Sequence, residues 1–105
     1  MEKRLIETIT KNGKITFFLN GFEDGKFFLR IIHIIQQVIN PEIINYQGGE
    51  DIDGFFEKDG LRVQVEYDTM LGNMIEVESN YQPDELDKVR KWVKQIWDAL
   101  QKQNA

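Results

Sequence analysis

The chain has 105 residues and a net charge of −5, with 41% hydrophobic and 30% charged side chains, which predicts one domain, residues 1–105, around a single hydrophobic core. It contains no cysteine, so disulfides, thiolate metal sites and thiol catalysis are excluded. No signal peptide is visible, and no apolar run is long enough to span a bilayer. We therefore expect a cytoplasmic protein that has no membrane partner.

The acidic side chains are concentrated in the middle of the sequence. Residues 50–87 carry twelve acidic and two basic side chains, whereas residues 1–49 carry five acidic and six basic, and residues 88–105 carry one acidic and five basic. The middle segment therefore has a net charge of −10. Such a segment repels phosphate backbones and attracts basic proteins. We expect a protein partner and no direct contact with nucleic acid.

The first elements predicted along the chain are two strands that form a hairpin. Residues 4–10 and 15–19 are rich in β-branched and aromatic residues, as strands are. Asn12-Gly13 lies between them and is typical of a tight hairpin turn, because both residue types tolerate positive φ.

A helix is predicted next, over residues 26–39. Asp24 can cap its first turn, and Asn40-Pro41 ends it because the residue before proline disfavours the helical region. Its polar residues recur at helical spacing and form one narrow stripe: Lys26, Arg30, His33 and Gln37. The remaining circumference is mostly apolar, so we expect more than half of the helix surface to be buried.

The acidic middle of the chain predicts an antiparallel meander. Residues 52–57, 61–68 and 75–78 each read as a strand, and residues 61–68 alternate cleanly between apolar and polar side chains. Such alternation indicates one buried and one solvated face. Lys58-Asp59-Gly60 supplies a turn. Residues 42–46 can form a further short strand.

A second helix begins near Pro83, since proline suits a first helical turn. Its apolar stripe consists of Leu86, Val89, Val93, Ile96, Trp97 and Leu100. Core packing is expected for both Trp97, which lies inside the stripe, and Trp92, which lies at its edge; a half-exposed Trp92 is the alternative that stays open. Together these elements predict an α+β fold with an antiparallel sheet of about five strands and two helices packed on one face, in the order ββαβββα.

The polar face of the meander is a candidate partner-binding surface. If Ile52 and Phe56 point to the core, Phe55 points outward among carboxylates, as an apolar anchor with a charged rim does in protein interfaces. The predicted partner-binding residues are Asp53, Phe55, Glu57, Asp59, Glu66, Asp68, Glu76 and Glu78. Two alternatives stay open. The face is only solvated, or the register is shifted by one residue and Phe56 is the outward side chain.

The sequence offers no pattern for catalysis or metal binding. Asp51-Ile52-Asp53-Gly54 resembles the start of a calcium-binding loop, but Phe56 stands where glycine is required and Arg62 where the last carboxylate ligand is required. His33 lies on the polar stripe of the first helix, and Ser79 has no histidine nearby in the sequence, so no Ser-His-Asp spacing exists. We expect no catalytic residue, no metal and no cofactor.

The run DGFFEKDGLRVQVEYDTMLGNMIEVE, residues 53–78, followed by a helix that contains tryptophan, resembles the small acidic immunity proteins of bacterial toxin–immunity systems, such as those of contact-dependent inhibition. The resemblance implies a non-enzymatic inhibitor that holds a cognate toxin, often a basic nuclease, and blocks its active site. The carboxylates would stand in for phosphates. Two other classes stay open: a structural or oligomerising domain, and a carboxylate-dependent metal enzyme.

Overall fold

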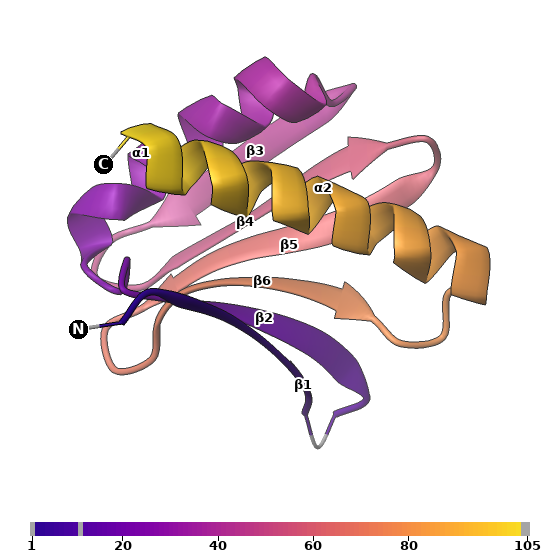
Figure 1. Cartoon of the computed structure of the whole chain (residues 1–105), viewed down its shortest axis with the longest axis horizontal. Coiled ribbons are helices and arrows are strands. Elements are labelled where there is room, and N and C mark those ends of the chain that lie inside the picture. Colours follow the sequence, from indigo (N-terminus) through magenta and orange to yellow (C-terminus); the bar gives the residue numbers. More distant parts are fainter. Residues whose placement is uncertain (1, 11, 104–105) are drawn as a thin grey trace.

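The computed structural model describes residues 2–10 and 12–103 (Figure 1). Over these residues, six strands form a single antiparallel sheet in the order β1-β2-β6-β5-β4-β3, and both helices cover the same side of it (Figure 1). The fold is therefore α+β. The strands are β1 (Arg4–Ile9), β2 (Lys14–Asn20), β3 (Ile43–Gly48), β4 (Ile52–Lys58), β5 (Leu61–Asp68) and β6 (Gly72–Glu78). The helical elements are a 3₁₀ turn η1 (Gly25–Phe27), α1 (Phe28–Ile34), a π-helical turn η2 (Ile35–Ile39) and α2 (Pro83–Gln103).

The sequence predicted about five strands in the order ββαβββα, which is one strand fewer than the structure has. The described chain runs ββαββββα, because residues 43–48 form a full strand, β3, at one edge of the sheet. Gly48 does not end the sheet but turns the chain back into β4, with φ at 145° and so little space that a Cβ would lie 2.2 Å from the carbonyl oxygen of Asp51. A glycine that looks like a break in the sequence is thus the requirement of a tight reversal.

The turns and caps lie where the sequence places them. Asp59 and Gly60 both adopt positive φ, 54° and 78°, which gives the two-residue turn between β4 and β5. Gly13 has φ of 74° in the β1–β2 hairpin, whose Lys11 lies outside the described residues. Asp24 Oδ1 accepts a hydrogen bond from the backbone N of Lys26 at 2.9 Å and caps the first helical segment.

The helical segment after Asp24 changes its winding along its length, from a 3₁₀ turn to α and then π. It ends at Asn40, which adopts a left-handed conformation with φ of 53°. Lys58 Nζ donates to the carbonyl oxygens of Ile39 and Asn40 at 2.8 and 3.3 Å. A cation at this position binds the carbonyls that a helix end leaves without partners and complements its dipole.

The core lies between the sheet and the two helices. Phe56 is fully buried and packs edge-on against Trp92, with ring centroids 5.9 Å apart. Trp97 packs in the same manner against Phe22, at 5.5 Å. Both tryptophans are core residues, as expected, and the alternative of a half-exposed Trp92 is wrong, since only 7% of it is exposed. The reason is that α2 packs over β4, so the Trp92 ring is enclosed between the helix and the sheet. Among the described residues, no helix is both long and apolar enough to cross a membrane.

Candidate protein-binding face

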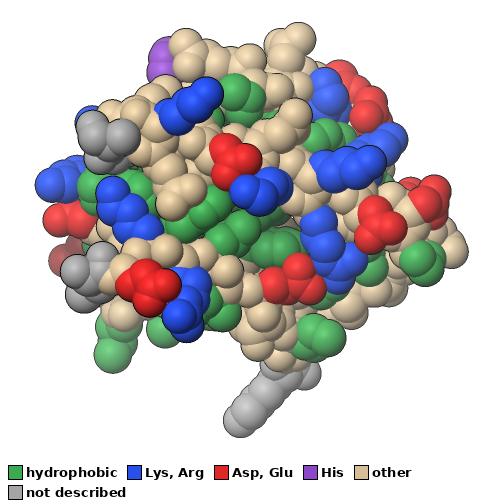
Figure 2. Space-filling model, in the orientation of Figure 1, with side chains coloured by type: hydrophobic (Ala, Val, Ile, Leu, Met, Phe, Trp, Pro, Cys, Tyr) green, Lys and Arg blue, Asp and Glu red, His purple; other side chains and the backbone are tan. Residues whose placement is uncertain are grey.

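The side of the sheet that faces away from α1 and α2 is called the open face here. Side chains alternate along each strand, and residues in register share a face, so the pairs Asp53↔Glu66 and Gln64↔Glu76 lie on the same side. The carboxylates that point to the open face are Asp53, Glu57, Glu66, Asp68, Glu76 and Glu78. On the opposite, helix-covered side, basic and acidic side chains are interspersed (Figure 2).

The two adjacent phenylalanines are oriented as the predicted register requires. Phe56 has no exposed surface, whereas Phe55 lies half-buried on the open face. Phe55 is not a bare anchor ringed by carboxylates, however. The guanidinium of Arg62 lies 4.1 Å from the Phe55 ring centroid, and Arg62 Nε donates to Glu57 Oε2 at 2.9 Å. Arg62 of β5 therefore covers the Phe55 ring and neutralises Glu57, which lies two residues further along β4.

Glu66 and Glu76 form a carboxyl pair near the centre of the open face. Burial comes first among the causes that raise the pKa of Glu66 to about 7, followed by a hydrogen bond with Glu76 and the negative charges of Glu76 and Asp53; Lys14 acts in the opposite direction. Thr16 Oγ1 donates to Glu76 Oε2 at 2.9 Å, which holds that carboxylate in place. Near neutral pH the pair therefore holds a proton for part of the time.

Two of the predicted site residues serve local structure. Asp59 lies in the β4–β5 turn, with its Oδ2 3.5 Å from Lys88 Nζ on α2, so it points toward the helix layer and away from the other carboxylates. Asp68 accepts hydrogen bonds from the backbone N of Met70 and of Leu71 at 2.7 and 3.0 Å. It caps the turn at the end of β5 and sits at the rim of the open face.

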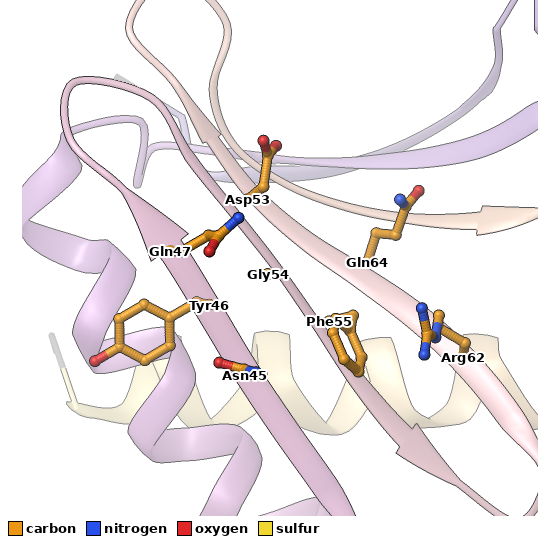
Figure 3. Close-up of a pocket in the computed structure, with 8 residues that line it drawn as sticks. All are labelled: Asn45, Tyr46, Gln47, Asp53, Gly54, Phe55, Arg62 and Gln64. Atoms are coloured by element: carbon orange, nitrogen blue, oxygen red, sulfur yellow. The ribbon is translucent and has the colours of Figure 1, made fainter.

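A hollow of about 290 Å³ lies on the open face over β3, β4 and β5 (Figure 3). It is lined by Asn45, Tyr46, Gln47, Asp53, Gly54, Phe55, Arg62 and Gln64. Its amide side chains can donate and accept hydrogen bonds, Asp53 supplies a negative charge, and Phe55 supplies an apolar floor. Sequence reasoning missed Asn45 and Gln47, because it did not place residues 43–48 beside β4. The alternation of the neighbouring strands, combined with that pairing, would have identified them.

The described residues contain no group of three or more acidic or histidine side chains placed to hold a metal ion. His33 is exposed on α1, away from the open face. Lys14 of β2, which also lies on the open face, donates from Nζ to Gln64 Oε1 at 2.9 Å. The arrangement is thus an acidic, hydrogen-bonding surface with one partly covered aromatic ring. Comparisons with protein-family models, curated proteins and solved structures give no match for this chain.

Proposed function

We propose that this chain binds a basic protein and inhibits it by occupying its active site or its substrate path, as an immunity protein does with a cognate toxin. One observation carries the proposal: the sheet has a face without covering helices, and all six acidic residues of β4, β5 and β6 point to it. A sheet face that is only solvated can carry acidic and basic side chains in equal numbers, so solvation alone does not explain an excess of negative charge. A face of one sign accelerates encounter with a partner of opposite sign by about 10–10³-fold, and this acceleration decreases with salt.

The carboxyl pair gives this surface a specific response to a cation. Glu66 holds a proton for part of the time near neutral pH because it is partly buried and because Glu76 lies beside it. A lysine or arginine of the partner, placed against the pair, would favour the doubly charged state. Binding would then release a proton and bring two carboxylates onto one basic side chain, in the manner of a phosphate group. Proton release on binding is therefore part of the proposal.

The test removes charge from the open face without changing shape. Asp53→Asn, Glu66→Gln and Glu76→Gln are combined, and binding is measured by calorimetry against the protein encoded by the neighbouring reading frame and against a panel of basic nuclease domains. A matched control, Asp84→Asn with Asp87→Asn and Asp98→Asn, removes the same number of carboxylates from exposed positions on α2, outside the open face.

We expect the triple variant of the open face to bind at least about tenfold more weakly, because each lost charge pair costs a fraction of a kcal/mol or more. The control variant should bind like the unaltered chain at moderate salt. Equal affinities of the two variants, with both folded, would show that the open face is not the contact surface.

A second candidate function is supported by the pKa of Glu66. A carboxyl group that titrates near 7 suits general acid–base catalysis, so a small hydrolase that uses Glu66 is the alternative to an inhibitor. The two candidates are distinguished by what happens to the partner. An inhibitor forms a lasting complex with one protein, whereas an enzyme converts many substrate molecules and is inactivated by Glu66→Gln. A third class, an oligomerising domain, would show concentration-dependent sedimentation of the chain alone.

A further inference from the structure

The outer side of β3 has hydrogen-bonding groups with no partner strand. β3 is an edge of the sheet, and the backbone N of Glu42 donates to the carbonyl oxygen of Glu57 at 3.0 Å, so the backbone of Glu57 faces β3. Alternate residues of an antiparallel strand face opposite neighbours. By the register of β3 and β4, Asn45 and Gln47 therefore bond to β4, while the N–H and C=O groups of Ile44 and Tyr46 point outward. Within residues 2–10 and 12–103, no backbone partner is found for them.

This edge lacks the features that usually protect an exposed strand. Natural sheets block free edges with charged side chains, proline or bulges. The sequence of β3, IINYQG, has none of these, and most of the strand is exposed, including 44% of Tyr46. The other edge strand, β1, carries Arg4 and Glu7, and Glu7 accepts from Arg90 of α2 at 3.0 and 3.1 Å. The two edges thus differ, because β1 carries charged side chains of the kind that discourage pairing and β3 does not.

We propose that β3 accepts an extended, basic segment of a partner protein as an additional strand of the sheet. This inference rests on the proposed function and names how the partner chain enters the open face. Strand addition supplies affinity through main-chain hydrogen bonds and specificity through alternate side chains. The hollow beside β3 can provide the specificity, because Asn45, Gln47 and Asp53 line it and can bind side chains of the added strand. Every second side chain of the added strand would lie on the side of this hollow.

Charge decides between a basic segment and a second copy of this chain. Glu42 precedes β3, Glu50 and Asp51 follow it, and residues 40–57 contain no lysine, arginine or histidine. If two copies paired antiparallel through β3 with Tyr46 opposite Tyr46, Glu42 of each copy would lie next to the β3–β4 turn of the other copy, which carries Glu50 and Asp51. Like charges brought together in this way oppose the pairing. A segment with lysine or arginine at both ends meets opposite charges at both ends instead.

The experiment uses a random peptide library displayed on phage and selected against the full chain. We expect the selected peptides to alternate β-branched residues with lysine or arginine. A synthetic copy of one of them is then tested against Tyr46→Pro, which removes the outward N–H but keeps an edge position that tolerates proline. The matched control is Tyr46→Ala, which removes the ring and keeps the N–H. Loss of one main-chain hydrogen bond should weaken binding by about tenfold relative to that control.

Amide hydrogen exchange on the unaltered chain gives a measurement that does not depend on the proline variant. The bound peptide should slow exchange at Ile44 and Tyr46, and not at the outward amides of β1. Selection of acidic or helical peptides, unchanged exchange at Ile44 and Tyr46, or dimerisation of the free chain through β3 would each overturn the inference. Suppose that the peptide binds Tyr46→Pro and Tyr46→Ala with equal affinity but does not bind the triple variant of the open face. Strand addition is then wrong, while the proposed function stands. If charge removal also has no effect, the proposed function fails as well.

Discussion

Arg62 covers Phe55: its guanidinium lies 4.1 Å from the ring centroid while its Nε holds Glu57 at 2.9 Å. The three side chains come from β4 and β5 and lie side by side on the open face. The ring is therefore available to a partner only if Arg62 moves or itself takes part in the contact. The apolar centre of the proposed interface is thus covered by a side chain that can change its rotamer.

Replacing Arg62 by alanine removes both of its contacts. An exposed cation–π pair contributes about 0.5–1 kcal/mol, and a surface ion pair contributes about 0–1 kcal/mol. We expect Arg62→Ala to lower the free energy of unfolding by about 1 kcal/mol in urea denaturation, and to speed association with a basic partner because Glu57 is no longer neutralised. Arg4→Ala, whose ion pair with Glu2 is well exposed, serves as the control. If both variants lower the free energy of unfolding by the same amount, the contact of Arg62 with Phe55 does not contribute to stability.

The two adjacent phenylalanines give a test of the strand register. Phe56 is fully buried against Trp92, and emptying such a site costs about 3–5 kcal/mol. Phe55 lies half-buried on the open face, so Phe55→Ala should cost only about 1 kcal/mol. Thermal unfolding followed by tryptophan fluorescence measures both, since Trp92 reports on the cavity directly. The reverse order of the two effects would mean that the register is shifted by one residue.

Stability should decrease as the pH rises because of Glu66. Its pKa is raised from 4.5 to about 7 in the folded chain, so between these values the folded state binds more protons than the unfolded state. Stability is then lost as the pH rises through this window. For a half-buried group, solvent screening reduces the effect to about 1 kcal/mol.

Urea midpoints measured from about pH 5 to pH 8 detect this contribution. Glu66→Gln should remove it and should be more stable than the unaltered chain at the upper end of the range. Glu78→Gln changes an exposed carboxylate on the same face and should leave the pH dependence intact. An unaltered pH dependence in Glu66→Gln would show that another group is responsible.

Some features follow from the sequence because they depend on neighbours along the chain. The alternation of residues 61–68 separates a buried from an open face, Asp59-Gly60 adopts the left-handed turn, and Asp24 caps the helix, all as predicted. The inward position of Phe56 follows from the same two-residue period. Backbone preference and side-chain period act over a few residues, so a sequence is enough to reveal them.

Other features depend on which strands become neighbours, and the tertiary structure alone decides this. The chain crosses from β2 to the far edge before it forms β3, and β6 returns to pair with β2. This order leaves β3 as an open edge, places Glu66 diagonal to Glu76, and brings Arg62 over Phe55. Each of these contacts joins different strands, and no local period encodes their register. The sequence by itself determined which side chains face outward, and the long-range pairing of strands determined which of them meet.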